Sequence, residues 1–178
     1  MLKVTDKSGK KIRALLVNYA CHCTTLSSEP NKISGDWAGY AQEYLERDNP
    51  GAIAMTIIGC GADANPAPRP GVDFAKQHGQ SIATATGELL SKELTPLHGK
   101  LEGHSKWIAL SFDKLPTRDE YAAIAANTNL HFAISYAAQK NVARLDRGEK
   151  LPTEFPYFVQ TWNFGNELAL VFLPGEVV

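Results

Sequence analysis

Apolar positions in the first half of the chain form short continuous runs separated by polar loops and by stretches with helical spacing. The run 12–20 (IRALLVNYA) has the length and flanks of a buried strand, and a polar loop over 21–35 follows it. The pattern then predicts a helix that starts at Asp36, a good N-cap residue, and ends near 49–51. Its apolar stripe consists of Trp37, Tyr40, Ala41, Tyr44 and Leu45.

The same order of elements repeats once. The apolar run 52–58 (AIAMTII) predicts a second strand, the loop 59–71 (GCGADANPAPRPG) follows it, and a long helix is expected over 74–94. Two strand-loop-helix units in tandem favour parallel strands joined by a right-handed crossover. Ligands in such sheets lie at the carboxyl ends of the strands. We therefore expect the two loops to be neighbours.

The second half of the chain has a different pattern. Thr117 and Glu120 form a T-x-x-E capping box that opens one of its helices. The expected elements are a strand over 101–112, helices over 118–126 and 130–147, and a hairpin of strands 157–163 and 167–173. The chain as a whole predicts an α/β fold with a mixed, partly parallel sheet flanked by helices, in a single domain over 1–178.

Charge and hydropathy narrow the classes of partner. Lys and Arg number 18 and Asp and Glu 19, for a net charge of −1, so the excess of cations that nucleic acids and anionic lipids require is absent from the composition. No apolar run approaches the ~18 residues that span a bilayer, and the start MLKVTDKSGKK lacks the apolar core of a signal peptide. Because the chain stops soon after an apolar strand pattern, we expect it to be a fragment of a longer protein.

Three cysteines, Cys21, Cys23 and Cys60, are interpreted as thiols, with a Cys21–Cys60 disulfide as the alternative. The CHC string lacks the C-x-x-C spacing of a zinc knuckle. A nucleophilic Cys60 with His22 as its base is one hypothesis. The simpler interpretation is a buried and inert Cys60, because its neighbours are small and apolar.

Four residues are candidates for chemistry. His22 follows the first strand, Asp63 and Asn65 lie in the loop after the second, and Glu176 follows an apolar strand and a Pro-Gly turn. The loop 59–71 has neither the Lys-Ser/Thr ending nor the G-x-G-x-x-G spacing of a phosphate loop, so nucleotide binding is not favoured. Each candidate also has a purely structural interpretation. His22 would be a hydrogen-bonded loop histidine, Asp63 would cap an N–H in a rigid proline turn, and Glu176 would be an exposed terminal acid.

The other four histidines have no partners at ligand spacing, and three large aromatic residues stand out in the second half of the chain. We interpret the histidines as surface or helix-face residues and the aromatic residues as core or rim. They are His78, His98, His104 and His131, and Tyr157, Trp107 and Trp162.

Four segments, in order, carry a resemblance to a known family. They are VNYACHCTTL, ISGDWAGYAQEYLE, GCGADANP and LPGE. Together they resemble the N-terminal catalytic domain of neutral/alkaline non-lysosomal ceramidases, which are zinc-dependent amidases. The resemblance runs from about 14 to 178 and covers an inner portion of that domain.

The resemblance implies roles for individual residues. His22 matches one of the family's zinc histidines and Glu176 its zinc carboxylate, while the family's other histidine precedes this segment and its tyrosine follows it. Zn²⁺ would therefore be held weakly by residues 1–178 alone. Asn65 stands where the family has a serine, so zinc-activated water would be the nucleophile, and Asn65 would polarise the carbonyl. Asp63 and Asp36 would orient the histidine or the water, with helix capping as the alternative for Asp36.

The resemblance further implies a zinc-dependent amidohydrolase that cleaves a linear N-acyl amide, so the partner would be a small-molecule amide or a lipid-like substrate. It also suggests a secreted or extracytoplasmic parent protein. One alternative is a degenerate domain that binds an amide or glycan ligand without turnover, because Asn65 replaces the serine. A thiol hydrolase that uses Cys60 is the other alternative.

Overall fold

The structure is a computed structural model that describes residues 1–28 and 31–178. The described chain is an α/β protein with four helices and two three-stranded sheets, one of them mixed with a parallel pair, which confirms the expected fold class. Its contacts divide into two compact units. The first unit is Met1–Leu97 with Gly175–Val178, and the second is His98–Pro174. The expectation of one domain over 1–178 stays a prediction.

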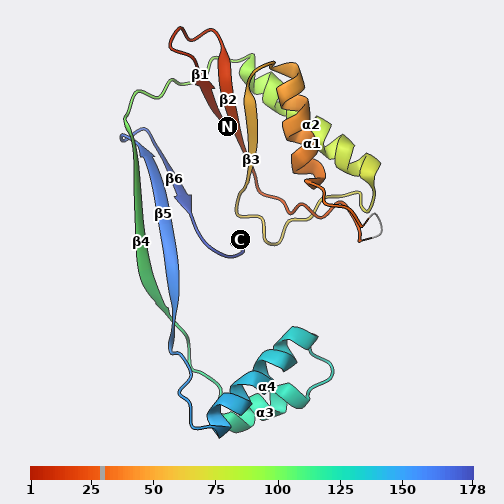
Figure 1. Cartoon of the computed structure of the whole chain (residues 1–178), viewed down its shortest axis with the longest axis vertical. Helices are drawn as coiled ribbons and strands as arrows, with labels where there is room; N and C mark the ends of the chain where they lie inside the picture. Colours follow the sequence, from red (N-terminus) through yellow and green to blue (C-terminus); the bar gives the residue numbers. More distant parts are fainter. Residues whose placement is uncertain (29–30) are drawn as a thin grey trace. The chain divides into compact units, whose positions relative to one another are not determined.

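The sheet of the first unit has the order β1-β2-β3 (Figure 1). β2 (Ile12–Tyr19) pairs in parallel with β3 (Ile53–Ile58) along its whole length, as the two tandem units predicted. β1 (Leu2–Thr5) pairs with β2 in the antiparallel direction, which makes the sheet mixed. The carboxyl ends of β2 and β3 therefore lie side by side at one edge of the sheet.

The sequence analysis did not predict β1, although a turn signal precedes β2. The Asp6 carboxylate accepts hydrogen bonds from the Ser8 hydroxyl and the Lys10 N–H, and Gly9 has a φ of +73°. The Asp6 N–H donates to the Lys11 carbonyl and closes the hairpin. An Asp followed by Ser and Gly is a common turn composition, so this hairpin was detectable from sequence.

Two helices, α1 (Asp36–Asp48) and α2 (Val72–Leu90), lie together on one side of this sheet (Figure 1). Both expected helices are confirmed, and α2 is shifted toward the N-terminus by a few residues. Apolar side chains from the inner face of the sheet meet the buried stripes of the helices, because alternate strand positions and helical repeats bury the same face. The resulting core contains Leu15, Val17, Leu45, Ala54 and Ala83.

The two helices approach each other closely at a glycine. A Cβ added to Gly79 of α2 would lie 2.5 Å from the Tyr40 Cβ, 2.9 Å from the Ala41 N and 2.9 Å from the Trp37 carbonyl oxygen. Backbone atoms of α1 cannot move away independently. The contact between α1 and α2 therefore requires a residue without a side chain at this position.

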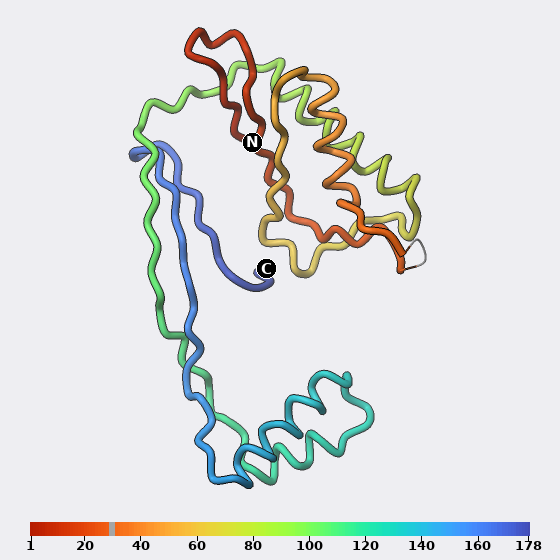
Figure 2. The backbone as a smooth tube through the Cα atoms, viewed as in Figure 1, coloured from red at the N-terminus to blue at the C-terminus, as the bar shows by residue number. Residues whose placement is uncertain are grey.

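The second unit is an antiparallel sheet with the order β4-β5-β6 and a helical hairpin inserted between its first two strands. Figure 2 follows the chain from the green strand out to the helices and back along the blue strand. The strands are β4 (Leu101–Ser111), β5 (Glu154–Phe164) and β6 (Leu168–Phe172), and the helices are α3 (Arg118–Ala126) and α4 (Phe132–Asp146). All five were expected from sequence.

The capping box predicted from sequence is present at the start of α3. Thr117 and Glu120 form both hydrogen bonds of the capping box.

Trp107 is 65% exposed and Trp162 37%, so these aromatic residues lie at the surface or rim of the described structure and not in a core. Within the described ranges, no helix combines the length and the apolar character needed to cross a bilayer.

We expect Gly79→Ala to lower the free energy of unfolding by about 2–3 kcal/mol, because its methyl group would overlap the α1 backbone. Gly87→Ala in the same helix is the matched control. No atom lies within 4 Å of its added Cβ, so it should raise the free energy of unfolding by about 0.5–1 kcal/mol through helix propensity. Urea denaturation measures both. Equal effects of the two substitutions would contradict the close approach.

Candidate functional site

The loops that follow β2 and β3 are joined by backbone hydrogen bonds. The His22 N–H donates to the Ala64 carbonyl at 2.9 Å, and the Gly71 N–H donates to the Thr25 carbonyl at 3.1 Å. The expectation that these loops are neighbours is confirmed. Their polar residues share the carboxyl edge of the parallel pair, where ligands bind in open α/β sheets.

His22 is half-buried and its imidazole has a defined partner. Its Nε2 lies 2.8 Å from the Ala62 carbonyl oxygen, which can only accept, so Nε2 carries the proton and donates it. In the neutral imidazole the lone pair is then on Nδ1, the atom that is left for a metal ion or a proton. The Trp37 indole N–H donates to the His22 carbonyl at 2.8 Å and fixes the backbone of the same residue.

The segment that carries Glu176 contacts the same loop residue. Ala62, which accepts from the imidazole, donates its own N–H to the Val177 carbonyl at 3.2 Å. One residue of the second loop thus binds the His22 side chain on one side and the neighbour of Glu176 on the other. Glu176 itself is exposed. The first loop, the second loop and the 175–178 segment therefore meet around Ala62.

Glycines let the second loop lie against the end of β2. A Cβ on Gly61 would lie 2.6 Å from both the Ala20 carbonyl carbon and the Cys21 N. On Gly59 it would lie 2.7 Å from the Asn18 Oδ1. Side chains at these positions would separate the loop from the strand, so the place of Ala62 beside His22 depends on the two glycines.

Asp36 departs from its predicted role as N-cap. Gly35 occupies the N-cap position without a side-chain bond, and Asp36 is the first helical residue, with a φ of +51°. Its carboxylate is 4% exposed and accepts from the Leu26 N–H at 2.8 Å and the Trp37 N–H at 2.7 Å. Asp36 therefore ties the first loop to α1 through the backbone, and it makes no bond to the imidazole in the described structure.

The cysteines are free, as interpreted from sequence. Burial raises the pKa of the Cys21 thiol, and the charge of Asp36 raises it further. Cys23 is exposed at the surface, yet partial desolvation by the surrounding atoms raises the pKa of its thiol. An Ala38 N–H lowers this pKa, and the charges of Asp36 and Cys21 raise it by smaller amounts. Both thiols therefore stay protonated, and poorly nucleophilic, at neutral pH.

Cys60 is exposed, so the prediction that it is buried is wrong. β3 ends at Ile58, and Cys60 lies in the loop beyond the apolar run that suggested burial. Among the contacts of the described residues, Cys60 has no hydrogen bond to His22, whose Nε2 proton is donated to Ala62. The thiol-hydrolase arrangement therefore gains no geometric support.

Asn65 is held by its oxygen. Its Oδ1 accepts from the Thr24 hydroxyl at 3.0 Å and from the Arg69 guanidinium at 3.2 Å, which leaves the amide Nδ2 with its two N–H donors. The neighbouring Asp63 is exposed, and its carboxylate has no partner among the described residues, so it does not cap a local N–H. Both side chains belong to the exposed surface of the second loop.

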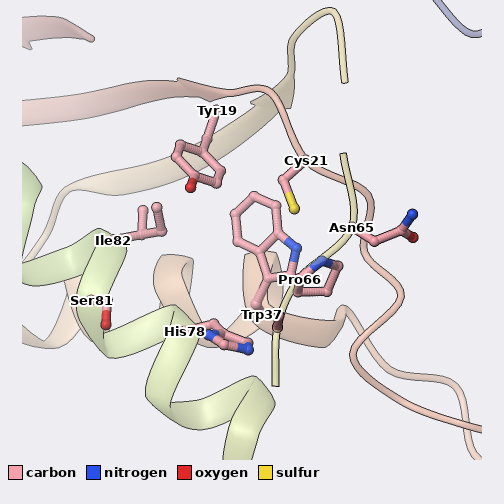
Figure 3. A pocket seen from close by; sticks show the side chains of 9 residues that line it. Tyr19, Cys21, Trp37, Asn65, Pro66, His78, Ser81 and Ile82 are labelled. Carbon is pink, nitrogen blue, oxygen red and sulfur yellow. The ribbon is translucent and has the colours of Figure 1, made fainter. Parts of the chain in front are cut away.

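A cavity of about 190 Å³ lies behind this loop (Figure 3). Its lining comes from β2, both loops and the two helices of the first unit, and Figure 3 shows the Asn65 amide pointing away from it. The lining residues are Tyr19, Cys21, Trp37, Asn65, Pro66, Ala67, His78, Ser81 and Ile82.

His78 was not expected in this region from the sequence. It was interpreted as a surface or helix-face residue, but its Nε2 donates to the Pro68 carbonyl at 3.0 Å and its ring lines the cavity. The available signal was helical spacing, since His78 lies three residues after the buried Ala75 and four before Ile82.

Metal-binding side chains are not gathered into a complete set. Within residues 1–28 and 31–178, no group of three or more His, Cys, Asp or Glu side chains is placed to hold a metal ion. His22 and Glu176 supply an imidazole nitrogen and a carboxylate, which are two of the donor types that zinc uses.

No protein-family model matches the chain, and no curated protein sequence matches it either.

Removal of the Asp36 charge should lower the pKa of the Cys21 and Cys23 thiols, because a carboxylate disfavours a nearby thiolate. Asp36→Asn tests this with little change in shape. Both pKa values should stay above the ordinary value of 9.0, since burial is the larger cause. The pH dependence of iodoacetamide alkylation, followed for each cysteine by peptide mass spectrometry, measures the shift. A pKa that is unchanged or higher would refute the electrostatic coupling.

Proposed function

We propose that the chain contributes part of the active site of a zinc-dependent amidohydrolase that cleaves a linear N-acyl amide. One observation supports the proposal more than any other. The Ala62 carbonyl accepts from the His22 imidazole while the Ala62 N–H donates to Val177, so residues far apart in the sequence converge where the resemblance to ceramidases implies zinc ligands.

The donor types fit zinc, although their number does not complete a site. His22 offers Nδ1, because Nε2 is bonded to a carbonyl, and a carbonyl partner on the other ring nitrogen is typical of metal-bound histidines. Glu176 is exposed and offers its carboxylate. The remaining ligands would come from polypeptide outside residues 1–178, as the resemblance implies. Zinc in such a site activates a bound water and polarises the scissile carbonyl.

The chain's own residues would position the substrate and the water. With its Oδ1 held by Thr24 and Arg69, the Asn65 amide presents N–H donors suited to a developing oxyanion. Asp63 has a carboxylate without a partner in the described chain, and it would accept a proton from the attacking water. Asp36 would act indirectly, since it anchors the loop that carries His22.

Zinc content of the natural full-length protein tests the ligand assignment. We expect about one zinc per chain, and loss of most of it in both His22→Ala and Glu176→Ala, because each substitution removes a direct ligand. His104→Ala and Glu154→Ala are the matched controls, since both residues are exposed in the second unit. Metal analysis after dialysis gives the content. Full zinc occupancy in both ligand variants would exclude the assignment.

A binding domain without turnover is the second candidate, and the contacts of Asn65 favour it. An amide held by Thr24 and Arg69 has a structural role that a catalytic serine would not need.

A panel of N-acyl amides, incubated with the full-length protein, separates the two candidates. The hydrolase predicts release of amine that disappears with a chelator and returns with zinc. Saturable binding of the same amides without release would instead establish the binding domain. The panel should include long-chain and short-chain acyl groups, because the resemblance implies an amide bond and not a particular chain.

A further inference from the structure

The cavity behind the second loop has walls formed mainly by carbon. Figure 3 shows the Tyr19 ring, the Trp37 indole, the Cys21 sulfur and the Ile82 side chain directed toward the same space. Trp37 is 1% exposed and Cys21 7%, so they border the cavity with little accessible surface, whereas Tyr19 is 48% exposed. The cavity therefore has a buried aromatic end and a side that is open to solvent.

Polar groups on the helix side of the cavity already have partners. The His78 Nε2 donates to the Pro68 carbonyl at 3.0 Å, and the Ser81 hydroxyl donates to the Gln77 carbonyl at 2.9 Å. Neither proton is available to a ligand. A charged ligand would lose its hydration here without gaining a counter-charge, which costs free energy.

The inner wall is equally unsuited to charge. The Trp37 indole N–H donates to the His22 carbonyl, and the Cys21 side chain is buried without a cation beside it among the described residues. The Tyr19 ring is the aromatic surface that stays open to a ligand, with the buried Trp37 ring and Cys21 sulfur behind it. The Tyr19 and Trp37 rings meet edge to face, with centroids 5.6 Å apart and an angle of 82° between their planes.

The volume of the cavity and the residues that line it indicate the size and chemical class of a ligand. A closed apolar cavity of about 150 Å³ holds one benzene molecule. A volume of about 190 Å³ therefore has room for a single six-membered ring, whose substituent would lie at the side open to solvent. Aromatic rings gain edge-to-face and sulfur contacts beyond simple burial. A planar ring can therefore pack against the exposed Tyr19 ring better than a saturated ring of the same size.

We propose that this cavity binds one uncharged aromatic ring of benzene size, carried by a small molecule whose polar part remains at the open side next to Tyr19. The cavity shares Asn65 with the proposed hydrolase site, but neither His22 nor Glu176 lines it. It binds its ligand whether or not His22 and Glu176 hold zinc, so the two proposals can fail independently.

Benzyl alcohol is the probe, and the signal is the indole N–H of Trp37 in two-dimensional NMR spectra of the full chain without added zinc. Trp107→Phe and Trp162→Phe identify the signals of the two other tryptophans. We expect a saturable shift of the Trp37 signal with a dissociation constant on the order of 1 mM, as suits so few non-hydrogen atoms. Absence of a saturable shift would overturn the proposal.

Two further alcohols test the shape of the site without any substitution. Cyclohexylmethanol has the same size but a saturated ring, and it should bind about fivefold more weakly. 1-Naphthalenemethanol exceeds the cavity and should cause no saturable shift of Trp37. Binding of cyclohexylmethanol as tight as that of benzyl alcohol would refute the preference for an aromatic ring and indicate a general apolar site.

A matched pair of substitutions tests the location. Cys21→Met extends an unbranched side chain into the cavity and should weaken benzyl alcohol binding about tenfold, because the space is filled. Cys23→Met makes the same change at an exposed neighbour that does not line the cavity, and it should leave the affinity unchanged. Equal affinities of the two variants would place the ligand elsewhere. If Cys21→Met does not fold, the series of alcohols on the unmodified chain still decides the proposal.

Discussion

The backbone hydrogen bonds of Ala62 are the interactions on which the candidate site depends. Its carbonyl accepts the His22 imidazole proton and its N–H donates to the Val177 carbonyl, so it joins three segments that are remote in the sequence. Such a residue must stand at the edge where β2 and β3 both end. The parallel pairing of these strands, from Ala14 with Ile53 to Tyr19 with Ile58, brings both loops to that edge.

Close packing then determines how near the loops can approach. Gly59 and Gly61 allow the second loop to lie against the end of β2, and Gly79 allows α2 to lie against α1. The buried Asp36 carboxylate adds a polar constraint, since it accepts N–H groups from the first loop and from α1. A buried carboxylate is costly unless it is hydrogen-bonded. Its bond to the Leu26 N–H therefore ties that part of the first loop to α1, and its charge disfavours thiolates at Cys21 and Cys23.

Much of the fold was predictable because its signals are local. Apolar runs marked β2 and β3, helical spacing marked α1, and the Thr117 capping box placed the start of α3. The candidate site was predictable only in part. The adjacency of the two loops followed from the parallel strands, but the tautomer of His22 and the anchoring of Asn65 by Thr24 depend on contacts between distant segments. No local pattern carries that information.

The amino-acid sequence by itself determined the order of the elements from β2 onward, the α/β class and the parallel pair, because periodicity and capping act over a few neighbouring residues. Tertiary structure alone decided that Asp36 ties the first loop to α1 instead of serving as N-cap, and that Cys60 is exposed. Helical spacing gives the face of α2 that carries His78, but only the fold shows that a cavity lies there. Those outcomes follow from which segments meet in space. The hydrogen-bonding demand of buried polar groups and the room left by glycines then select the arrangement.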